Sequence, residues 1–162
     1  MTSLNLTQKE NMLLQDQQKH EQLCVQKYQD YAQQAQDPQL QQLFNSLSQK
    51  EQQHLDTINQ LLNGQIPNLQ QNQQQGQQPG QQQNAQTSQQ FALSGGTVNP
   101  HDITLCNDML ITEKYISNSY DNAIFENTNS QVRQILNHIQ KEEQQHGEAI
   151  YNYIQSKGMY NP

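Results

Sequence analysis

The sequence is poor in several residue types that often define a protein's chemistry. Its 162 residues include no Trp and two Cys, and only 14% of them are charged. Basic residues are the scarcer sign, since 8 Lys and Arg stand against 15 Asp and Glu, for a formal net charge of −7. Nucleic-acid binding needs a basic patch, and the sequence has none, so we expect no nucleic-acid partner. No apolar run approaches the roughly 20 residues that span a bilayer, so we expect no membrane partner.

The two cysteines, Cys24 and Cys106, lie far apart and in no Cys-x-x-Cys pair. They predict neither a disulfide framework nor a zinc site, and they exclude an iron centre built from four cysteines. We therefore expect both to be small core residues. Residues 1–10 lack the apolar segment of a secretory signal, so we expect synthesis in the cytoplasm without a signal peptide.

A low-complexity segment divides the sequence. Between residues 65 and 90, Gln fills 14 of 26 positions, with Gly76, Pro79 and Gly80 interspersed. Such a segment has too little apolar surface to offset the entropy lost on ordering. We expect residues 65 to about 98 to form a flexible linker, although Gln-rich segments also favour association between chains.

Helix signals flank this linker on both sides. Thr7 and Glu10 have the spacing of a capping box, and Pro38 and Pro100 suit the first turn of a helix. Together with the apolar periodicity, these signals predict four helices, over about residues 8–35, 38–62, 99–126 and 131–156.

The predicted fold is all-α: a ferritin-like four-helix bundle made of two duplicated helical hairpins with a long crossover. A single domain would span residues 1–162, with hairpin 1 at about 7–64, the Gln-rich linker at about 65–98 and hairpin 2 at about 99–158. The short loops make each hairpin antiparallel. The long connection lets the third helix start at the opposite end of the bundle, and ferritin-like bundles have one such crossover.

An internal repeat supports the two-hairpin arrangement. A shift of 92 residues superposes the two halves without a gap, placing Glu21 on Glu113, Tyr28 on Tyr120, and the Glu-Gln-Gln-His run 51–54 on 143–146. A period this long in two copies indicates a duplicated hairpin rather than a solenoid. Two related hairpins would pack with pseudo-two-fold symmetry, which would place equivalent residues face to face.

Acidic and His residues of the repeat fall on helix faces that are otherwise apolar. Spacings of three and four residues mark an inward face. In the second expected helix this face contains Leu40, Leu43, Leu47, Glu51, His54, Ile58 and Leu61. In the fourth it contains Val132, Ile135, Ile139, Glu143, His146, Ile150 and Tyr153. Glu21 and Glu113 lie on the apolar faces of the other two helices, so four carboxylates are expected to converge at mid-bundle.

Burying four carboxylates together needs a source of positive charge, because each unpaired one costs several kcal/mol. No Lys or Arg lies on these faces at that level. One Glu from each of two helices, with Glu-x-x-His from each of the other two, is the ligand pattern of di-iron and di-manganese carboxylate bundles. The sequence therefore predicts two divalent ions, iron or manganese with zinc also possible, bound by Glu21, Glu51, His54, Glu113, Glu143 and His146. Two alternatives remain open: the six residues face solvent, or they are a relic site without metal.

Several neighbours of these six residues have candidate roles. Tyr28 and Tyr120 are expected to be core aromatics with hydroxyls bonded at the edge of the bundle, or else residues that support the metal ligands or form a radical. Asp16 and Asp108 are candidates for the carboxylates that accept the imidazole N–H groups. Glu142 either faces solvent or the edge of the site, or acts as an extra ligand.

The second half resembles the spore coat protein F (Coat F) family of endospore-forming bacteria over about residues 100–162. The resemblance lies in Asp108-Met109-Leu110, Thr112-Glu113-Lys114, Tyr120, Ala123, Glu126, Arg133, residues 142–147, Tyr153 and Gly158-Met159-Tyr160. The first hairpin looks like a diverged partner of the second. The resemblance implies a ferritin-like helical fold and a place in the spore coat. The implied partners are other spore coat proteins or further copies of this chain.

Two functions follow from the residues and the resemblance together. The first is a spore coat protein with a dinuclear iron or manganese site. The second is an oxidase, or a peroxidase or catalase, similar to rubrerythrin, ferritin or manganese catalase. Many Coat F proteins are structural and some lack a full set of metal ligands, whereas both halves of this sequence keep Glu and Glu-x-x-His. Whether the chain is an enzyme, and which residues would be catalytic, stays open at this point.

Overall fold

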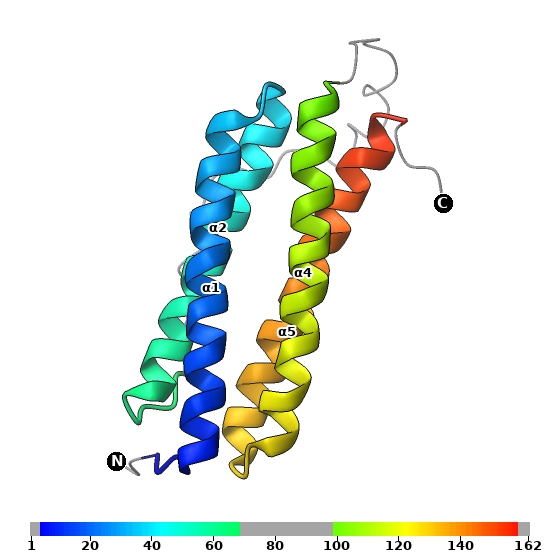
Figure 1. The fold of residues 1–162 in the computed structure, drawn as a ribbon. Helices are drawn as coiled ribbons and strands as arrows, with labels where there is room; N and C mark the ends of the chain where they lie inside the picture. The colour runs from blue at the N-terminus through cyan, green and yellow to red at the C-terminus, as the bar shows by residue number, and fades with distance from the viewer. Residues whose placement is uncertain (1–3, 69–98, 159–162) are drawn as a thin grey trace, which may run out of the picture.

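The computed structural model describes residues 4–68 and 99–158 of the chain. It has helix α1 at Gln8–Gln34, α2 at Pro38–Leu62, α4 at Pro100–Glu126 and α5 at Ser130–Ser156. Figure 1 shows these helices as two hairpins lying side by side. The two described ranges contain no strand, so the prediction of an all-α protein with four helices is confirmed. Most of the predicted Gln-rich linker lies outside the described residues.

Each helix begins where the sequence supplies a capping side chain. At α1, the Thr7 amide donates to the Glu10 carboxylate at 2.7 Å, and the Glu10 amide donates to the Thr7 hydroxyl at 3.2 Å. Asp37, Asn99 and Asn129 cap the other three helices by accepting hydrogen bonds from first-turn amides. These local signals explain why the observed helix bounds agree with the expected ones to within a residue.

Two buried acidic residues tie each hairpin to the loop of the other. Glu10, in the first turn of α1, accepts from the Thr128 amide at 2.6 Å and from the Thr128 hydroxyl at 2.8 Å. Asp102, in the first turn of α4, accepts from the amides of Gln36 and Asp37, both at 2.9 Å. Glu10 and Asp102 are equivalent under the 92-residue shift, so the two contacts are reciprocal.

These contacts set the helix directions. The α1–α2 loop and the start of α4 share one end of the bundle, while the α4–α5 loop and the start of α1 share the other. The Leu4 amide donates to the Gly64 carbonyl at 3.1 Å, which places the end of α2 at this second end. The connection from α2 to α4 therefore joins opposite ends of the bundle, as a long crossover requires.

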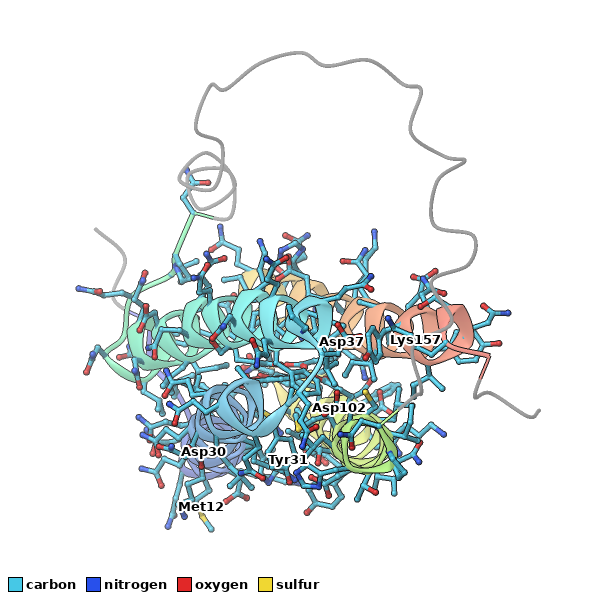
Figure 2. All side chains as sticks on the ribbon, turned by 90° about the horizontal axis from the view of Figure 1, so that it is seen from above. Met12, Asp30, Tyr31, Asp37, Asp102 and Lys157 are labelled. Atoms are coloured by element: carbon cyan, nitrogen blue, oxygen red, sulfur yellow. The ribbon has the colours of Figure 1, made fainter. Side chains whose placement is uncertain are left out.

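The hairpins pack side by side, with α1 against α4 and α2 against α5. Seen from above in Figure 2, α2 and α5 lie on one side of the molecule and α1 and α4 on the other. The interior contains two apolar clusters, each with residues from both hairpins. Phe44 and Met109 belong to the cluster near the α1–α2 loop, and Leu14 and Ile139 belong to the cluster near the α4–α5 loop. Between the clusters lies a layer of buried polar side chains.

Both cysteines are buried free thiols, as predicted. Cys24 lies in one apolar cluster and Cys106 in the other, which separates them across the bundle. Burial raises the pKa of the Cys106 thiol to about 12 and the pKa of Cys24 well above its usual range. Both thiols are therefore neutral and contribute to the core as small apolar groups.

We expect Glu10→Gln to lower the free energy of unfolding by about 2 kcal/mol at neutral pH. Burial by itself raises the pKa of Glu10, but hydrogen bonds from Thr128 and Thr7 outweigh it and lower the pKa from 4.5 to about 2. The ionised carboxylate therefore stabilises the fold above pH 4.5, and this stabilisation is lost as the pH falls toward 2. Urea denaturation of both proteins at neutral pH and below pH 4.5 measures the difference.

The matched control for this experiment is Glu126→Gln. The Glu126 side chain is 46% exposed and pairs only with the exposed Lys9, so its loss should change stability little. The difference in free energy of unfolding between wild type and Glu10→Gln should shrink on acidification. A difference that stayed constant would contradict the proposed anchoring role of the ionised Glu10.

Candidate metal centre

The six residues predicted as metal ligands meet in one layer at mid-bundle. This polar layer consists of Glu21 on α1, Glu51 and His54 on α2, Glu113 on α4, and Glu143 and His146 on α5. Their exposed fractions lie between 0% and 5%. The alternative in which these residues face solvent is therefore wrong.

The ligand atoms of the polar layer form two overlapping groups. The first group consists of Glu21, Glu51, His54 and Glu143, and the second consists of Glu51, Glu113, Glu143 and His146. Within each group, one oxygen or nitrogen atom from every residue lies within 4.8 Å of all the others. Glu51 and Glu143 belong to both groups. The geometry thus offers two adjacent positions that share two carboxylates.

Each imidazole directs Nδ1 toward carboxylates from both hairpins. His54 Nδ1 lies 3.2 Å from Glu51 and 3.1 Å from Glu143, and His146 Nδ1 lies 2.9 Å from Glu51. The two rings are stacked, with centroids 5.4 Å apart and an angle of 15° between their planes. This near-parallel pairing follows from the equivalent positions of the two His residues in the repeat.

Two buried tyrosines reach the layer from the opposite hairpin. The Tyr28 hydroxyl donates to Glu113, and the Tyr120 hydroxyl donates to Glu21. Both tyrosines are 0% exposed, as expected of core aromatics. Their hydroxyls bond inside the bundle, which corrects the expectation that they bond at its edge. The two contacts exchange under the 92-residue shift. They show the face-to-face placement of equivalent residues that the repeat predicts.

Three carboxylate oxygens in the layer are left without a protein partner. Oε2 of Glu21, Glu113 and Glu143 has no hydrogen-bond partner within residues 4–68 and 99–158. A buried acceptor without a donor is costly, so such atoms call for an explanation in a native fold. Carboxylate oxygen with imidazole nitrogen is a donor set that divalent iron, manganese and zinc accept. The residues present therefore fit a pair of divalent cations.

The surrounding carboxyl groups raise the pKa of both imidazoles. Burial lowers the pKa of His146, but the nearby carboxylates of Glu113, Glu143 and Glu51 outweigh it and raise the pKa to about 12. The pKa of His54 is also raised well above its usual range, by hydrogen bonds to carboxylates that include Glu142. Both imidazoles are therefore in the doubly protonated, positively charged form when no cation is bound.

The four carboxyl groups divide into two pairs. Burial raises the pKa of Glu51 to about 7 and the pKa of Glu143 well above 4.5. For Glu21 and Glu113, the effect of burial is outweighed by the imidazoles of His54 and His146, whose Nδ1 atoms lie 3.7 Å from these carboxylates, and the pKa is lowered. There is therefore a pH range in which Glu21 and Glu113 are ionised while the two shared carboxyls, Glu51 and Glu143, remain protonated. A cation entering the layer must displace these protons, so its binding depends on pH.

Glu142 breaks the symmetry of the layer. One of its carboxylate oxygens lies 2.8 Å from Nε2 of His54, on the outer side of that ring. This contact lowers the pKa of Glu142 to about 2. The residue equivalent to Glu142 is the exposed Lys50, which cannot accept a hydrogen bond from His146. Glu142 thus lies at the edge of the layer and orients only one of the two imidazoles.

The structure corrects the roles expected for Asp16 and Asp108. Asp108 accepts a hydrogen bond from the Tyr31 hydroxyl at 2.6 Å and pairs with Lys27 at 2.6 Å, and Asp16 is exposed. Five residues correspond to about 1.4 helical turns, so a residue five positions before an inward Glu projects from another face. The carboxylate that accepts from the outer imidazole nitrogen is Glu142, at Nε2 of His54.

A comparison with known protein families finds a match for the second hairpin. Residues 101–162 match the family model described as the Coat F domain. This match covers α4 and α5, which contribute three of the six layer residues, and it supports the resemblance seen in the sequence. No curated protein and no solved structure matches the chain. None of the helices in the described part of the chain has the length and apolarity needed to cross a membrane.

Proposed function

We propose that this chain is a spore coat protein with a ferritin-like bundle, whose polar layer binds two divalent ions, iron or manganese. The Coat F match over residues 101–162 suggests the spore coat. The metal half of the proposal rests on one observation: six buried oxygen and nitrogen donors form two overlapping groups with unpartnered carboxylate oxygens. The proposed partners are other spore coat proteins or further copies of this chain.

The ferritin-like assignment rests on connectivity and ligand arrangement together. The α2–α4 connection joins opposite ends of the bundle. Two helices each contribute one Glu to the layer, and the other two each contribute Glu-x-x-His. Ferritin-like bundles combine these two features, which simple up-down bundles do not. The reciprocal hydrogen bonds of the two hairpins further support an origin by duplication.

The six residues divide into two roles in this proposal. Glu51 and Glu143 would contribute to both positions, because both belong to each ligand group. Glu21 with His54, and Glu113 with His146, complete one position each. Bound ions would supply positive charge to the layer and, if redox-active, an electron couple.

Three further residues orient the ligands. The hydroxyls of Tyr28 and Tyr120 fix one oxygen each of Glu113 and Glu21, which leaves the second oxygen of each for a cation. Glu142 accepts from Nε2 of His54 and thereby keeps Nδ1 directed into the layer.

Redox catalysis of the rubrerythrin, ferritin or manganese-catalase type is the second candidate function. One observation favours it over a purely structural role: a cleft in the surface reaches two of the layer carboxylates, Glu113 and Glu143. A centre that only stabilises the bundle needs no such opening. The two functions are compatible in one coat protein.

Metal analysis of protein purified without chelator tests the proposal. We expect two equivalents of iron or manganese per chain, and loss of both in Glu51→Ala, because Glu51 belongs to both ligand groups. Glu126→Gln, which alters an exposed carboxylate, should retain both equivalents. Wild-type protein without stoichiometric metal, and without uptake of added Fe(II) or Mn(II), would contradict the metal half. Absence of the chain from the extracted coats of spores would contradict the coat half.

A further inference from the structure

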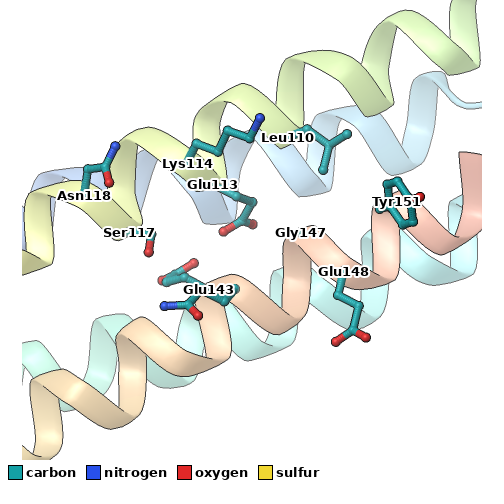
Figure 3. Close-up of a pocket in the computed structure, with 10 residues that line it drawn as sticks. Leu110, Glu113, Lys114, Ser117, Asn118, Glu143, Gly147, Glu148 and Tyr151 are labelled. Atoms are coloured by element: carbon teal, nitrogen blue, oxygen red, sulfur yellow. The ribbon is translucent and has the colours of Figure 1, made fainter. Parts of the chain in front are cut away.

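A cleft of about 630 Å³ opens between α4 and α5 and reaches the polar layer. Figure 3 shows the carboxylates of Glu113 and Glu143 turned toward each other between the two helices. These residues are 3% and 0% exposed, so they form the inner end of the cleft. The exposed Lys114 and Gln144 line its outer part. The cleft therefore connects the surface with one side of the polar layer.

The seam between α1 and α2 is equivalent to this cleft under the 92-residue shift, and large side chains fill it. Gly147 on the cleft corresponds to Leu55, and Ser117 corresponds to Val25. Leu55 and Val25 are each only 8% exposed. Two apolar side chains thus pack where the cleft has a glycine and a hydroxyl, so the two hairpins differ in steric access to the layer.

A hydrogen bond also closes the α1/α2 seam. The side-chain amide of Gln18 on α1 donates to the side-chain oxygen of Asn59 on α2 at 2.6 Å. The equivalent positions on the other hairpin are Leu110 and Tyr151, which flank the cleft. The bond joins the two helices at the level where α4 and α5 leave a gap.

Gly147 is the residue that distinguishes the two seams most sharply. It lies inside α5, and its φ is not positive, since the positive-φ glycines of the described ranges are Gly64 and Gly158. A Cβ added at Gly147 would meet the nearest side-chain atom, of Leu110, at 4.0 Å, which is ordinary contact. A glycine in a helix interior destabilises it by roughly 0.5–1 kcal/mol relative to alanine. Neither backbone nor packing requires this glycine, and its consequence is open space above the layer.

We propose that the α4/α5 cleft is the entrance and binding site for a small neutral hydrogen-bonding molecule, which reaches the polar layer from the side of Glu113 and Glu143 rather than through the α1/α2 seam. Gly147 and Ser117 determine this one-sided access. The inference rests on the proposed function where it assigns a metal pair to the inner end of the cleft.

The residues that line the cleft indicate which kind of ligand it would bind. Ser117, Asn118 and Gln144 offer a hydroxyl and two amide groups, which both donate and accept hydrogen bonds. The outer part contains one charge of each sign, Lys114 and Glu148, and the inner end is acidic. The inner carboxylates would repel an anion, whereas a neutral polar molecule finds hydrogen-bond partners in Ser117, Asn118 and Gln144.

Carbodiimide labelling of the metal-free protein tests one-sided access directly. Diisopropylcarbodiimide is a small neutral reagent that activates carboxyl groups, and an added amine records each activated site by mass spectrometry. We expect Glu113 to be labelled about tenfold faster than its equivalent Glu21, and Glu143 about tenfold faster than Glu51. A tenfold ratio of rates corresponds to a difference of about 1.4 kcal/mol in activation free energy. Comparison within equivalent pairs cancels most of the difference in intrinsic reactivity.

Variants at the cleft complete the test. Gly147→Leu copies the residue of the closed seam and should slow the labelling of Glu113 and Glu143 about tenfold, to the rates of their equivalents. Ser117→Val is a milder version in case the larger change perturbs α5. Gln155→Leu, which adds the same side chain at an exposed position of α5, should leave the rates unchanged.

Equal labelling of the two members of each pair in wild type would overturn the inference, and so would unchanged rates in both Gly147→Leu and Ser117→Val. The labelling uses no metal, so its outcome is separate from that of the metal analysis. Gly147→Leu leaves all six layer residues intact and should still bind two ions per chain. One-sided labelling in a chain that binds no metal would overturn the proposed function and the inner metal pair but retain the cleft as a site.

Discussion

Two equivalents of Mn(II) are expected to raise the melting temperature of the metal-free protein by about 10 °C. A ligand at a thousand times its Kd stabilises a folded protein by about 4 kcal/mol. For a chain of 150–250 residues, each kcal/mol shifts the melting temperature by roughly 2–4 °C. The effect is large because the ions would bind six buried donor residues that converge only in the folded chain, so the free energy of binding adds to the stability of the fold. Scanning calorimetry of chelator-treated protein, with and without Mn(II), measures it.

The variant Glu51→Gln separates binding in the layer from binding elsewhere. It preserves the shape of the side chain but removes a charge shared by both ligand groups, so the metal-induced rise should disappear. The metal-free variant should be no less stable than wild type at neutral pH, because burial raises the pKa of Glu51 to about 7 and so favours its neutral form. Glu126→Gln should behave as wild type. The same thermal shift in wild type and Glu51→Gln would show that Mn(II) binds outside the polar layer.

Loss of either buried tyrosine hydroxyl is expected to weaken metal binding by about 10–100-fold, the usual effect of removing a group that orients a ligand. Tyr28→Phe removes the donor to Glu113, and Tyr120→Phe removes the donor to Glu21. The two contacts are equivalent under the repeat, so the two variants should lose similar affinity. Titration calorimetry with Mn(II) gives both values.

Tyr31→Phe is the matched control for this comparison. Its hydroxyl also donates to a carboxylate, that of Asp108, but this pair lies outside the polar layer. The same chemical change should therefore leave Mn(II) affinity unaltered. Equal losses in Tyr31→Phe and Tyr28→Phe would mean that the measured effect comes from general destabilisation and not from ligand orientation.

The balance between coat protein and enzyme depends on the differences between the hairpins. The repeat gives both halves the same ligands, but Glu142 orients only His54, and the cleft opens only toward Glu113 and Glu143. A purely structural pair of ions has no need of either difference. Both differences lie in the hairpin that matches the Coat F domain, so they would be the first features to compare among proteins that contain this domain.

The sequence by itself determined the helices and the six residues of the polar layer. The Thr7 cap and Pro38 in the first turn of α2 act within one helical turn, so they fix helix starts without help from the rest of the fold. The inward positions of Glu51 and His54 follow from a periodicity of three and four residues along one helix. Local geometry therefore sufficed to place each of these residues on the inward face of its helix, and their burial confirms it.

Only the tertiary structure decided which side chains meet across the bundle. The sequence indicated Asp108 as a partner for an imidazole, whereas packing brought Glu142 to His54. The periodicity of the apolar helix faces could not single out Gly147. Its only signal in the sequence was that the equivalent residue of the first hairpin is Leu55. Contacts such as Tyr28 with Glu113 join residues 85 positions apart. Their existence depends on how far apart the helices lie and how each is rotated, and the packing of the whole core sets both quantities.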